Sequence, residues 1–175
     1  MTDAAWNRTQ WLHRPLCRHY AWVLLDALRV PVRHGDGDCE HRFHWALGWL
    51  ADGECEGLGA WTHLEEDTDS LRWWFADLQA RGVERLSNWA CPGTGQGRGH
   101  VPSPAVLDAE QVRAGLHRAV RRHGGFESAS AVLDFIADAL QRAERRLDRE
   151  RLIAKGKARL DSGSQAAPAG PLTTQ

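Results

Sequence analysis

Asp26 is a candidate functional residue because it lies in the middle of an apolar run, VLLDALRV. The run is apolar on both sides of the strand it is expected to form, which is typical of a central strand covered on both faces. A buried carboxylate is costly unless a cation or hydrogen bonds stabilise its charge. The sequence offers two kinds of cation, a divalent metal ion or the guanidinium groups of Arg29 and Arg33. Asp26 is therefore either a metal ligand or one half of a structural ion pair.

The cysteine and histidine residues do not form a recognisable metal site. The four cysteines are far apart and make no CxxC pair, and the nine histidines show no ligand spacing with them. The glycine-rich run 91–104 lacks the Lys-Ser/Thr pair of a phosphate-binding P-loop. We find neither the apolar N-terminal run of a signal peptide nor the ~20 apolar residues of a membrane span. We therefore expect a cytoplasmic protein with reduced thiols and no membrane partner.

Basic residues are concentrated in the C-terminal part of the chain. The net charge of the whole chain is −1, but residues 113–159 contain 12 Arg or Lys against 6 Asp or Glu. This excess favours an anionic partner such as DNA, although a solvated helix surface produces the same pattern. The candidate contacts to DNA are Arg113, Arg118, Arg121 and Arg122.

Length and composition indicate one domain with a tail. The 175 residues are 42% hydrophobic and 26% charged, which is ordinary for a globular protein. Nine tryptophans are expected to fill the core and its edges. We divide the chain into a lead-in, a core, a Gly/Pro loop, a helical part and a disordered tail, with the bounds 1–19, 20–92, 93–104, 105–160 and 161–175.

The core is predicted to be a sheet crossed by one helix. Three successive strands, joined by a turn at 34–40 and by the hairpin signal Asp52-Gly53, are expected at 20–33, 43–50 and 53–61. Capping residues at 67–70 begin a helix that Gly82 ends. Because that helix is a crossover connection, the short apolar segment 83–90 is expected to form a fourth strand parallel to the first.

The C-terminal part is predicted to be helical. Asp108 is a candidate N-cap for a helix that runs to about Arg122, and Gly124-Gly125 breaks it. A last helix is expected to begin at Ser128 or Ser130, and it carries an apolar stripe at helical spacing.

This order of elements resembles the ribonuclease H-like core, in which a three-stranded meander, a crossover helix and a parallel fourth strand precede further helices. We therefore predict an α/β fold with such a core, followed by C-terminal helices. The resemblance implies that a strand Asp, an acid after the fourth strand and an acid on a later helix meet and hold two divalent metal ions. Three carboxylates suit Mg²⁺, which prefers oxygen ligands.

Residues 20–90 resemble the catalytic core of Mutator-type bacterial insertion-sequence transposases, which use a DDE triad of acids. The similar pieces, in order, are LLDALRVPVR, ALGWLADGECEGLGAW and FADLQARGVERL. In the family, the corresponding pieces are a strand with L-D-A/G, a strand A-L-G-V, the motif D-G-x-x-E-x-L-G and a helix end D-L-K-A-R-G-V. A later segment, AEQVRAGLHRAVRRHGGF, is similar to the family's stretch built around N-A-I-E-x-x-N and G-x-F.

The resemblance puts Asp26 in the place of the first catalytic acid and Glu110 in the place of the last, which implies that both bind Mg²⁺. This chain departs from the family at the second acid, where it has Cys91-Pro92-Gly93. The family's long helical insertion before the last acid and its N-terminal DNA-binding region have no counterpart here. We therefore expect a truncated, internally deleted transposase that is catalytically defective.

The sequence leaves three functional hypotheses open. The first is a defective transposase-like protein that associates with DNA, with itself or with an intact transposase. The second is a nucleic-acid-binding or regulatory protein whose basic C-terminal helices contact phosphates. The third is a residual Mg²⁺-dependent nuclease that uses Asp26, Glu110 and one further acid.

Overall fold

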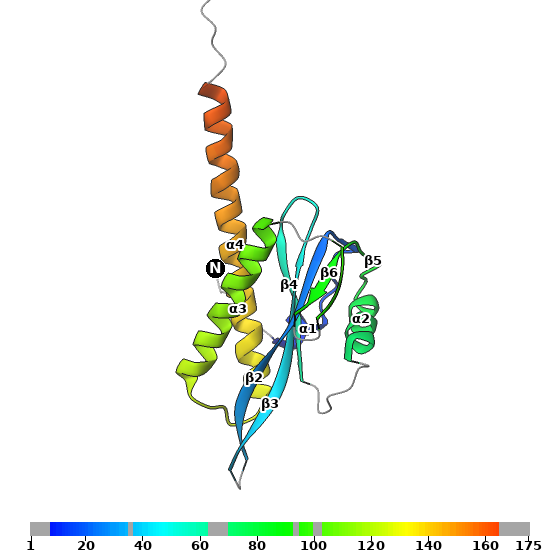
Figure 1. The fold of residues 1–175 in the computed structure, drawn as a ribbon, viewed down its shortest axis with the longest axis vertical. Coiled ribbons are helices and arrows are strands. Elements are labelled where there is room, and N and C mark those ends of the chain that lie inside the picture. Colours follow the sequence, from blue (N-terminus) through cyan, green and yellow to red (C-terminus); the bar gives the residue numbers. More distant parts are fainter. Residues whose placement is uncertain (1–7, 35–36, 63–69, 93–94, 100–102, 165–175) are drawn as a thin grey trace, which may run out of the picture.

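The computed structural model describes residues 8–34, 37–62, 70–92, 95–99 and 103–164. Figure 1 shows a central sheet with helices on both of its faces. The strands of this sheet are β2 (Trp22–His34), β3 (Gly37–Trp49), β4 (Cys55–Thr62), β6 (Trp89–Cys91) and β7 (Gln96–Arg98). The helices are α1 (Arg8–His13), α2 (Ser70–Ala80), α3 (Ser103–His123) and α4 (Ala129–Ser164). A separate parallel pair consists of β1 (His19–Tyr20) and β5 (Arg85–Leu86).

The strands of the sheet lie in the spatial order β4-β3-β2-β6-β7. β2, β3 and β4 form an antiparallel meander, in which Asp26 on β2 pairs with Trp45 on β3. β6 lies on the other side of β2 and runs parallel to it, with Val23 opposite Trp89. β7 then returns antiparallel to β6. The structure is thus a mixed α/β fold, and the predicted meander, parallel fourth strand and C-terminal helices are confirmed.

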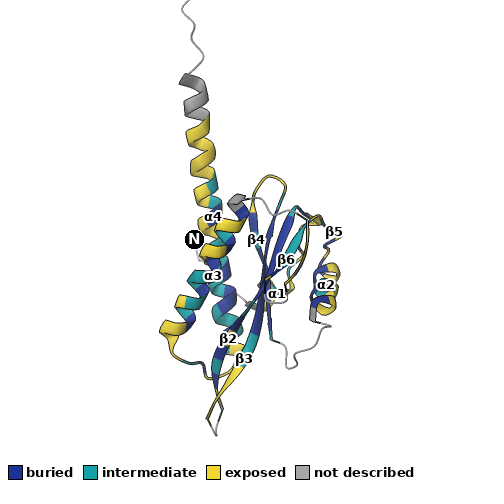
Figure 2. Cartoon of the chain, in the orientation of Figure 1, coloured by how far each residue is buried: buried dark blue, intermediate teal, exposed yellow. Residues whose placement is uncertain are grey.

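Alternation along β2 decides which helices its side chains meet. Leu24 and Leu28 belong to the core that the sheet forms with α1, α3 and α4, whereas Val23 and Leu25 belong to the core formed with α2. Side chains two residues apart on a strand point to the same face. Asp26 therefore points to the α3 and α4 side, together with Leu24 and Leu28. Figure 2 shows that burial is concentrated in the sheet and on the helix surfaces turned toward it.

Two breaks in the predicted strands occur side by side. The first expected strand is interrupted at Ala21, which separates β1 from β2, and the expected fourth strand is divided into β5 and β6. Asn88, at the second break, donates a hydrogen bond from its side chain to the carbonyl of Ala21 at 2.9 Å. These polar contacts replace regular pairing at the breaks. The predicted turn at 34–40 is also shorter, because the β2–β3 ladder continues to the pair His34 and Gly37.

The predicted Gly/Pro loop contains regular structure. β7 lies within it, and α3 begins at Ser103, well before the expected cap at Asp108. Pro104 fits the first helical turn, where its missing N–H removes no helical hydrogen bond. The apolar stripe of α3 reaches back to this turn, which explains the earlier start: its buried members are Ala105, Ala109, Val112, Leu116 and Val120.

The last helix begins as predicted and extends further. The Ser128 hydroxyl accepts a hydrogen bond from the backbone N–H of Ala131 at 3.1 Å, which is N-cap geometry. α4 continues to Ser164 and so enters the segment predicted to be a disordered tail, whose remaining residues 165–175 lie outside the described ranges. The predicted capping residues 67–69 are outside them as well. No helix in the described ranges combines the length and the apolar character needed to cross a membrane.

Candidate functional site

Asp26 is almost fully buried, with 3% of its surface exposed. Its Oδ1 accepts a hydrogen bond from the backbone N–H of Ala27 at 2.8 Å. Its Oδ2 lies 3.1 Å from Nε of Arg113 on α3. The Arg113 contact is an ion pair rather than an aligned hydrogen bond, because Oδ2 has no aligned donor among the described residues. Burial raises the pKa of the Asp26 carboxyl, and the Ala27 N–H and the Arg113 guanidinium partly offset this effect.

The cation beside Asp26 is Arg113 and neither of the two arginines, Arg29 and Arg33, that the sequence suggested. Arg29 instead forms a surface ion pair, with its Nη1 3.6 Å from Oε2 of Glu40. Arg29 is an odd number of residues from Asp26, so its side chain leaves β2 on the opposite face. Arg33 lies near the far end of β2, with its guanidinium close to Gly125. The expected strand-internal ion pair is therefore wrong, and the true partner, Arg113, comes from a helix far along the chain.

Glu110 lies on α3 one turn before Arg113, and 64% of its side chain is exposed. Its Oε1 is 3.8 Å from Nη1 of Arg113, as the i, i+3 spacing on a helix permits. The same guanidinium thus contacts both carboxylates that the resemblance assigns to a metal. In the family segment N-A-I-E-x-x-N, the position of Arg113 is occupied by Asn. The fold therefore brings Asp26 and Glu110 to one place, with a permanent positive charge in contact with both.

These residues do not fit the three-carboxylate Mg²⁺ site that the resemblance implies. Within the described part of the chain, no group of three or more His, Cys, Asp or Glu is arranged to hold a metal ion. The end of β6, where the family has its second acid, holds the buried free thiol of Cys91, which is a poor ligand for Mg²⁺. Asp108 does not replace it, because the charges that affect its pKa are Glu150 and Arg146 on α4. We assign no metal-dependent step to these residues.

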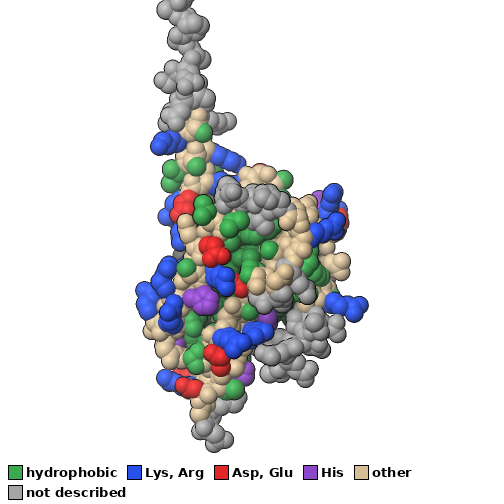
Figure 3. All heavy atoms as spheres, viewed as in Figure 1, with side chains coloured by type: hydrophobic (Ala, Val, Ile, Leu, Met, Phe, Trp, Pro, Cys, Tyr) green, Lys and Arg blue, Asp and Glu red, His purple; other side chains and the backbone are tan. Residues whose placement is uncertain are grey.

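The arginines proposed as DNA contacts occupy two environments. Arg118, Arg121 and Arg122 are exposed on α3, whereas Arg113 is half-buried beside Asp26. The last turn of α3 is basic, which complements the negative end of the helix dipole. In Figure 3, Lys and Arg side chains gather along the side of the molecule that α3 and α4 form. This side presents a positive surface, and Arg113 is set apart from it by its ion pair.

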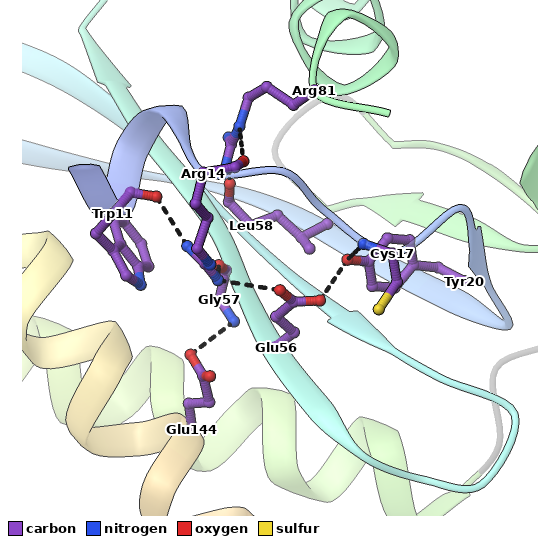
Figure 4. Close-up of polar contacts among 9 residues, drawn as sticks. All are labelled: Trp11, Arg14, Cys17, Tyr20, Glu56, Gly57, Leu58, Arg81 and Glu144. Atoms are coloured by element: carbon purple, nitrogen blue, oxygen red, sulfur yellow. Dashed lines mark hydrogen bonds and ion pairs between the residues drawn. The ribbon is translucent and has the colours of Figure 1, made fainter. Parts of the chain in front are cut away.

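A second polar cluster, drawn in Figure 4, links the segment around α1 to β4. Glu56 on β4 accepts hydrogen bonds from the Tyr20 hydroxyl at 2.5 Å and from Nη2 of Arg14 at 3.2 Å. Nη2 of Arg14 also donates to the carbonyl of Gly57 at 2.6 Å. Burial raises the pKa of Tyr20 far above its ordinary value, and the hydrogen bond to Glu56 and the charge of Glu56 raise it further. The phenol therefore stays protonated and acts as a donor. Sequence reasoning missed this role, although Glu56 is the acid of the D-G-x-x-E-x-L-G motif.

Arg81, the arginine of the A-R-G-V helix end, holds three segments together. It follows α2 and is buried, with 8% of its surface exposed. Its Nε donates to the carbonyl of Arg14 at 3.1 Å, and its Nη1 donates to the carbonyl of Leu58 on β4 at 2.6 Å. Its Nη1 also lies 3.5 Å from Oδ2 of Asp77 on α2. The motif residues Glu56 and Arg81 thus stabilise the scaffold and lie apart from the contacts of Asp26.

Two carboxylates of α4 bind the backbone of β4, which is an edge strand of the sheet. Oε2 of Glu144 accepts a hydrogen bond from the N–H of Gly57 at 3.2 Å. Oδ1 of Asp148 accepts one from the N–H of Cys55 at 3.4 Å. Burial raises the pKa of the Glu144 carboxyl, and the Gly57 N–H partly opposes this rise.

We expect Glu144→Gln to change the pH dependence of stability. Because the folded-state pKa of Glu144 is raised, its contribution to stability is present at low pH and is lost as the pH rises through that pKa. Gln keeps an acceptor for the Gly57 N–H and does not ionise. Relative to the wild type, the melting temperature of the variant should therefore rise by about 2 °C between pH ~4 and neutral pH. Glu150→Gln, an exposed change on the same helix, should not produce this difference, and parallel pH profiles for Glu144→Gln and the wild type would contradict the expectation.

Comparison with known proteins relates residues 4–90 to a described protein family. A family model described as "Transposase, Mutator family" matches residues 4–90. The match takes in α1, which lies before the segment from which the resemblance was read. The resemblance of residues 20–90 to Mutator-type insertion-sequence transposases is thus confirmed, and the similarity extends over residues 4–90.

Individual relatives agree with the family match. The chain is 34% identical over 80 residues to a probable transposase for the ISRM3-like insertion sequence element of Sinorhizobium fredii, which covers 44% of this chain and 19% of that protein. It is 33% identical over 97 residues to a probable insertion-sequence transposase of Corynebacterium diphtheriae, covering 53% of this chain and 27% of the relative. It is 34% identical over 82 residues to the transposase for ISRM3 of Rhizobium meliloti, covering 47% and 18%. The chain therefore spans roughly a fifth to a quarter of the length of the curated relatives it matches.

Proposed function

We propose that this chain is a transposase-derived protein, related to DNA transposition, whose metal-dependent centre is defective. The observation that carries this proposal is that Oδ2 of Asp26 lies 3.1 Å from the guanidinium of Arg113, which also contacts Glu110. A two-metal centre for phosphodiester chemistry needs carboxylates that are free to bind the ions. Asp26 and Glu110 are instead engaged with a cation of the protein itself, and Cys91 stands where the family has its second acid.

We further infer that the sheet and its helices form a ribonuclease H-like core. The spatial order β4-β3-β2-β6, with an antiparallel meander followed by a parallel strand, supports this inference. The positions of Asp26 on the central strand and Glu110 on a later helix, facing the same side of the sheet, also support it. Between β6 and α3 the chain has only a short connection with β7, where the family has a long helical insertion.

The proposed defect is tested by nicking of supercoiled plasmid DNA in the presence of Mg²⁺ or Mn²⁺. We expect neither the wild type nor Asp26→Ala to nick the plasmid above the buffer control, while a full-length Mutator-family transposase serves as the active reference. Nicking by the wild type that disappears in Asp26→Ala would contradict the proposal and would support a residual nuclease.

The remaining function in this proposal is association with DNA through the basic side of α3. Arg121 and Arg122 are exposed in its last turn. Contacts to phosphates release counterions, so affinity falls as salt rises. Replacing both residues by Gln should weaken binding of duplex DNA and reduce the slope of log K against log salt concentration by about 2.

A matched double variant separates this surface from the net charge of the protein. Arg85 and Arg98 are exposed on β5 and β7, and replacing both by Gln removes the same charge elsewhere. We expect that variant to keep the wild-type salt slope. Equal losses in the two double variants, or a wild type that does not bind DNA, would contradict a DNA-binding role for α3.

A further inference from the structure

We propose that the guanidinium of Arg113 takes the place of the metal cation between Asp26 and Glu110 and turns a catalytic position into a structural ion pair that fixes α3 on β2. This inference rests on the proposed function, because it treats Asp26 and Glu110 as the positions of two former metal ligands. The disagreement between the expected metal and the residues present is itself the observation that leads to it.

The buried charge of Asp26 requires compensation. Asp26 is 3% exposed in the middle of the central strand, and an unpaired carboxylate there is strongly disfavoured. A divalent ion removes that cost only when it is bound, whereas Arg is protonated at every pH at which the protein is folded. Arg113 thus supplies a positive charge that needs no ion from solution. Because this charge is part of the chain, it lies beside Asp26 in every folded molecule.

The guanidinium of Arg113 is close to both carboxylates. Nε of Arg113 lies 3.1 Å from Oδ2 of Asp26, and Nη1 of the same group lies 3.8 Å from Oε1 of Glu110. Two nitrogen atoms of one guanidinium group therefore lie within ion-pair distance of two carboxylates from different elements. His117, one turn further along α3, adds a favourable charge effect on Asp26. α3 thus carries three ionisable residues in a row, Glu110, Arg113 and His117, with Arg113 in the middle.

Both oxygen atoms that Asp26 could offer to a metal ion already face other groups of the protein. Oδ1 of Asp26 already accepts the hydrogen bond from Ala27, and Oδ2 faces Arg113. A divalent cation that binds these oxygens has to displace the guanidinium, whose stem is half-buried on α3. The wild-type protein should therefore not respond to divalent cations at this position, and its stability should depend on Arg113 instead.

The experiment is a double-mutant cycle on thermal stability, with Mn²⁺ as the probe. We expect Arg113→Gln to lower the melting temperature by about 5 °C in the wild type, because it leaves Asp26 buried without its cation. In the Asp26→Asn background the same change should cost less than about 2 °C, since the two residues act as a pair. Arg118→Gln, which removes an exposed charge from the same helix, should have little effect in either background.

The response of the melting temperature to Mn²⁺ then shows whether Arg113 occupies the position of a former metal ion or forms an ordinary ion pair. At millimolar concentration, and against NaCl of equal ionic strength, Mn²⁺ should leave the melting temperature of the wild type unchanged. It should restore part of the loss in Arg113→Gln, and it should have no effect in the double variant Asp26→Asn/Arg113→Gln. Electron paramagnetic resonance should show immobilised Mn²⁺ with Arg113→Gln, and freely tumbling Mn²⁺ with the wild type and with the double variant.

Three results would overturn the inference: Asp26-dependent binding of Mn²⁺ to the wild type, additive effects of Asp26→Asn and Arg113→Gln, or an Arg113→Gln protein that Mn²⁺ does not stabilise. The plasmid assay keeps this outcome separate from the proposed function. If the wild type nicks plasmid DNA but Mn²⁺ does not bind at Asp26, the proposed catalytic defect is contradicted and the proposed ion pair is not. If the effects of Asp26→Asn and Arg113→Gln on the melting temperature are additive and the wild type does not nick plasmid DNA, the proposed ion pair is contradicted and the proposed defect is not.

Discussion

Arg81→Met is expected to lower the free energy of unfolding by about 3 kcal/mol. The side chain of Arg81 donates to the carbonyls of Arg14 and Leu58, and its Nη1 lies 3.5 Å from Oδ2 of Asp77. Met fills a similar volume but donates no hydrogen bond, so the carbonyls of Arg14 and Leu58 lose this donor, whereas Oδ2 of Asp77 keeps the hydrogen bond from Nε1 of Trp61 at 3.3 Å. Leaving a buried acceptor unsatisfied costs about 1–3 kcal/mol for each group. Urea unfolding should show a lower midpoint with an unchanged slope, because the surface exposed on unfolding stays the same.

Arg85→Met is the matched control for this prediction. Arg85 is exposed on β5 and lies only a few residues further along the chain. The same chemical change there should alter stability by less than about 0.5 kcal/mol. Equal effects of the two substitutions would mean that lost charge, rather than the buried hydrogen bonds of Arg81, determines the result.

Gly48→Ala is expected to destabilise the protein by about 1–3 kcal/mol, although alanine adds only one methyl group. A Cβ atom at Gly48 would lie 2.6 Å from Cδ1 and 2.8 Å from Cε1 of Tyr20. The Tyr20 ring is 1% exposed, and its hydroxyl donates to Glu56, so it has little freedom to move away. The substitution should also loosen the contact between Tyr20 and Glu56, which near-ultraviolet circular dichroism of the aromatic side chains would report.

Gly115→Ala gives the opposite expectation for the same chemical change. Gly115 lies inside α3, and a Cβ atom there meets nothing within 4 Å. Alanine in a helix interior is more stable than glycine by roughly 0.5–1 kcal/mol. A Gly48→Ala protein as stable as Gly115→Ala would show that the Tyr20 ring adapts and that close packing does not fix Gly48.

The local pattern of the sequence was enough to predict most of the fold. The apolar run around Asp26, the Asp52-Gly53 turn and the helix end at Gly82 each depend on neighbours within a few residues, and the structure has the elements they predict. The break at Ala21 was not predictable in this way. It depends on the side chain of Asn88, which reaches the Ala21 carbonyl only after the chain has folded.

The candidate site was predictable in part for the same reason. The burial of Asp26 followed from its apolar neighbours. Its partner depends on how α3 lies across β2, and no pattern within the strand contains that information. Strand parity alone excludes Arg29 from the face of Asp26, so this signal was present in the sequence. The i, i+3 spacing of Glu110 and Arg113 on one helix was a second signal.

The carboxylates that α4 directs at β4 have a consequence for assembly. An edge strand with free N–H groups is a template on which another chain can add a strand, and such addition leads to aggregation. At Cys55 and Gly57 these donors are already bound by Asp148 and Glu144. The N–H groups of Cys55 and Gly57 are thereby closed to a neighbouring strand. A loss of Glu144 together with Asp148 would free both donors and favour strand addition at this part of the edge.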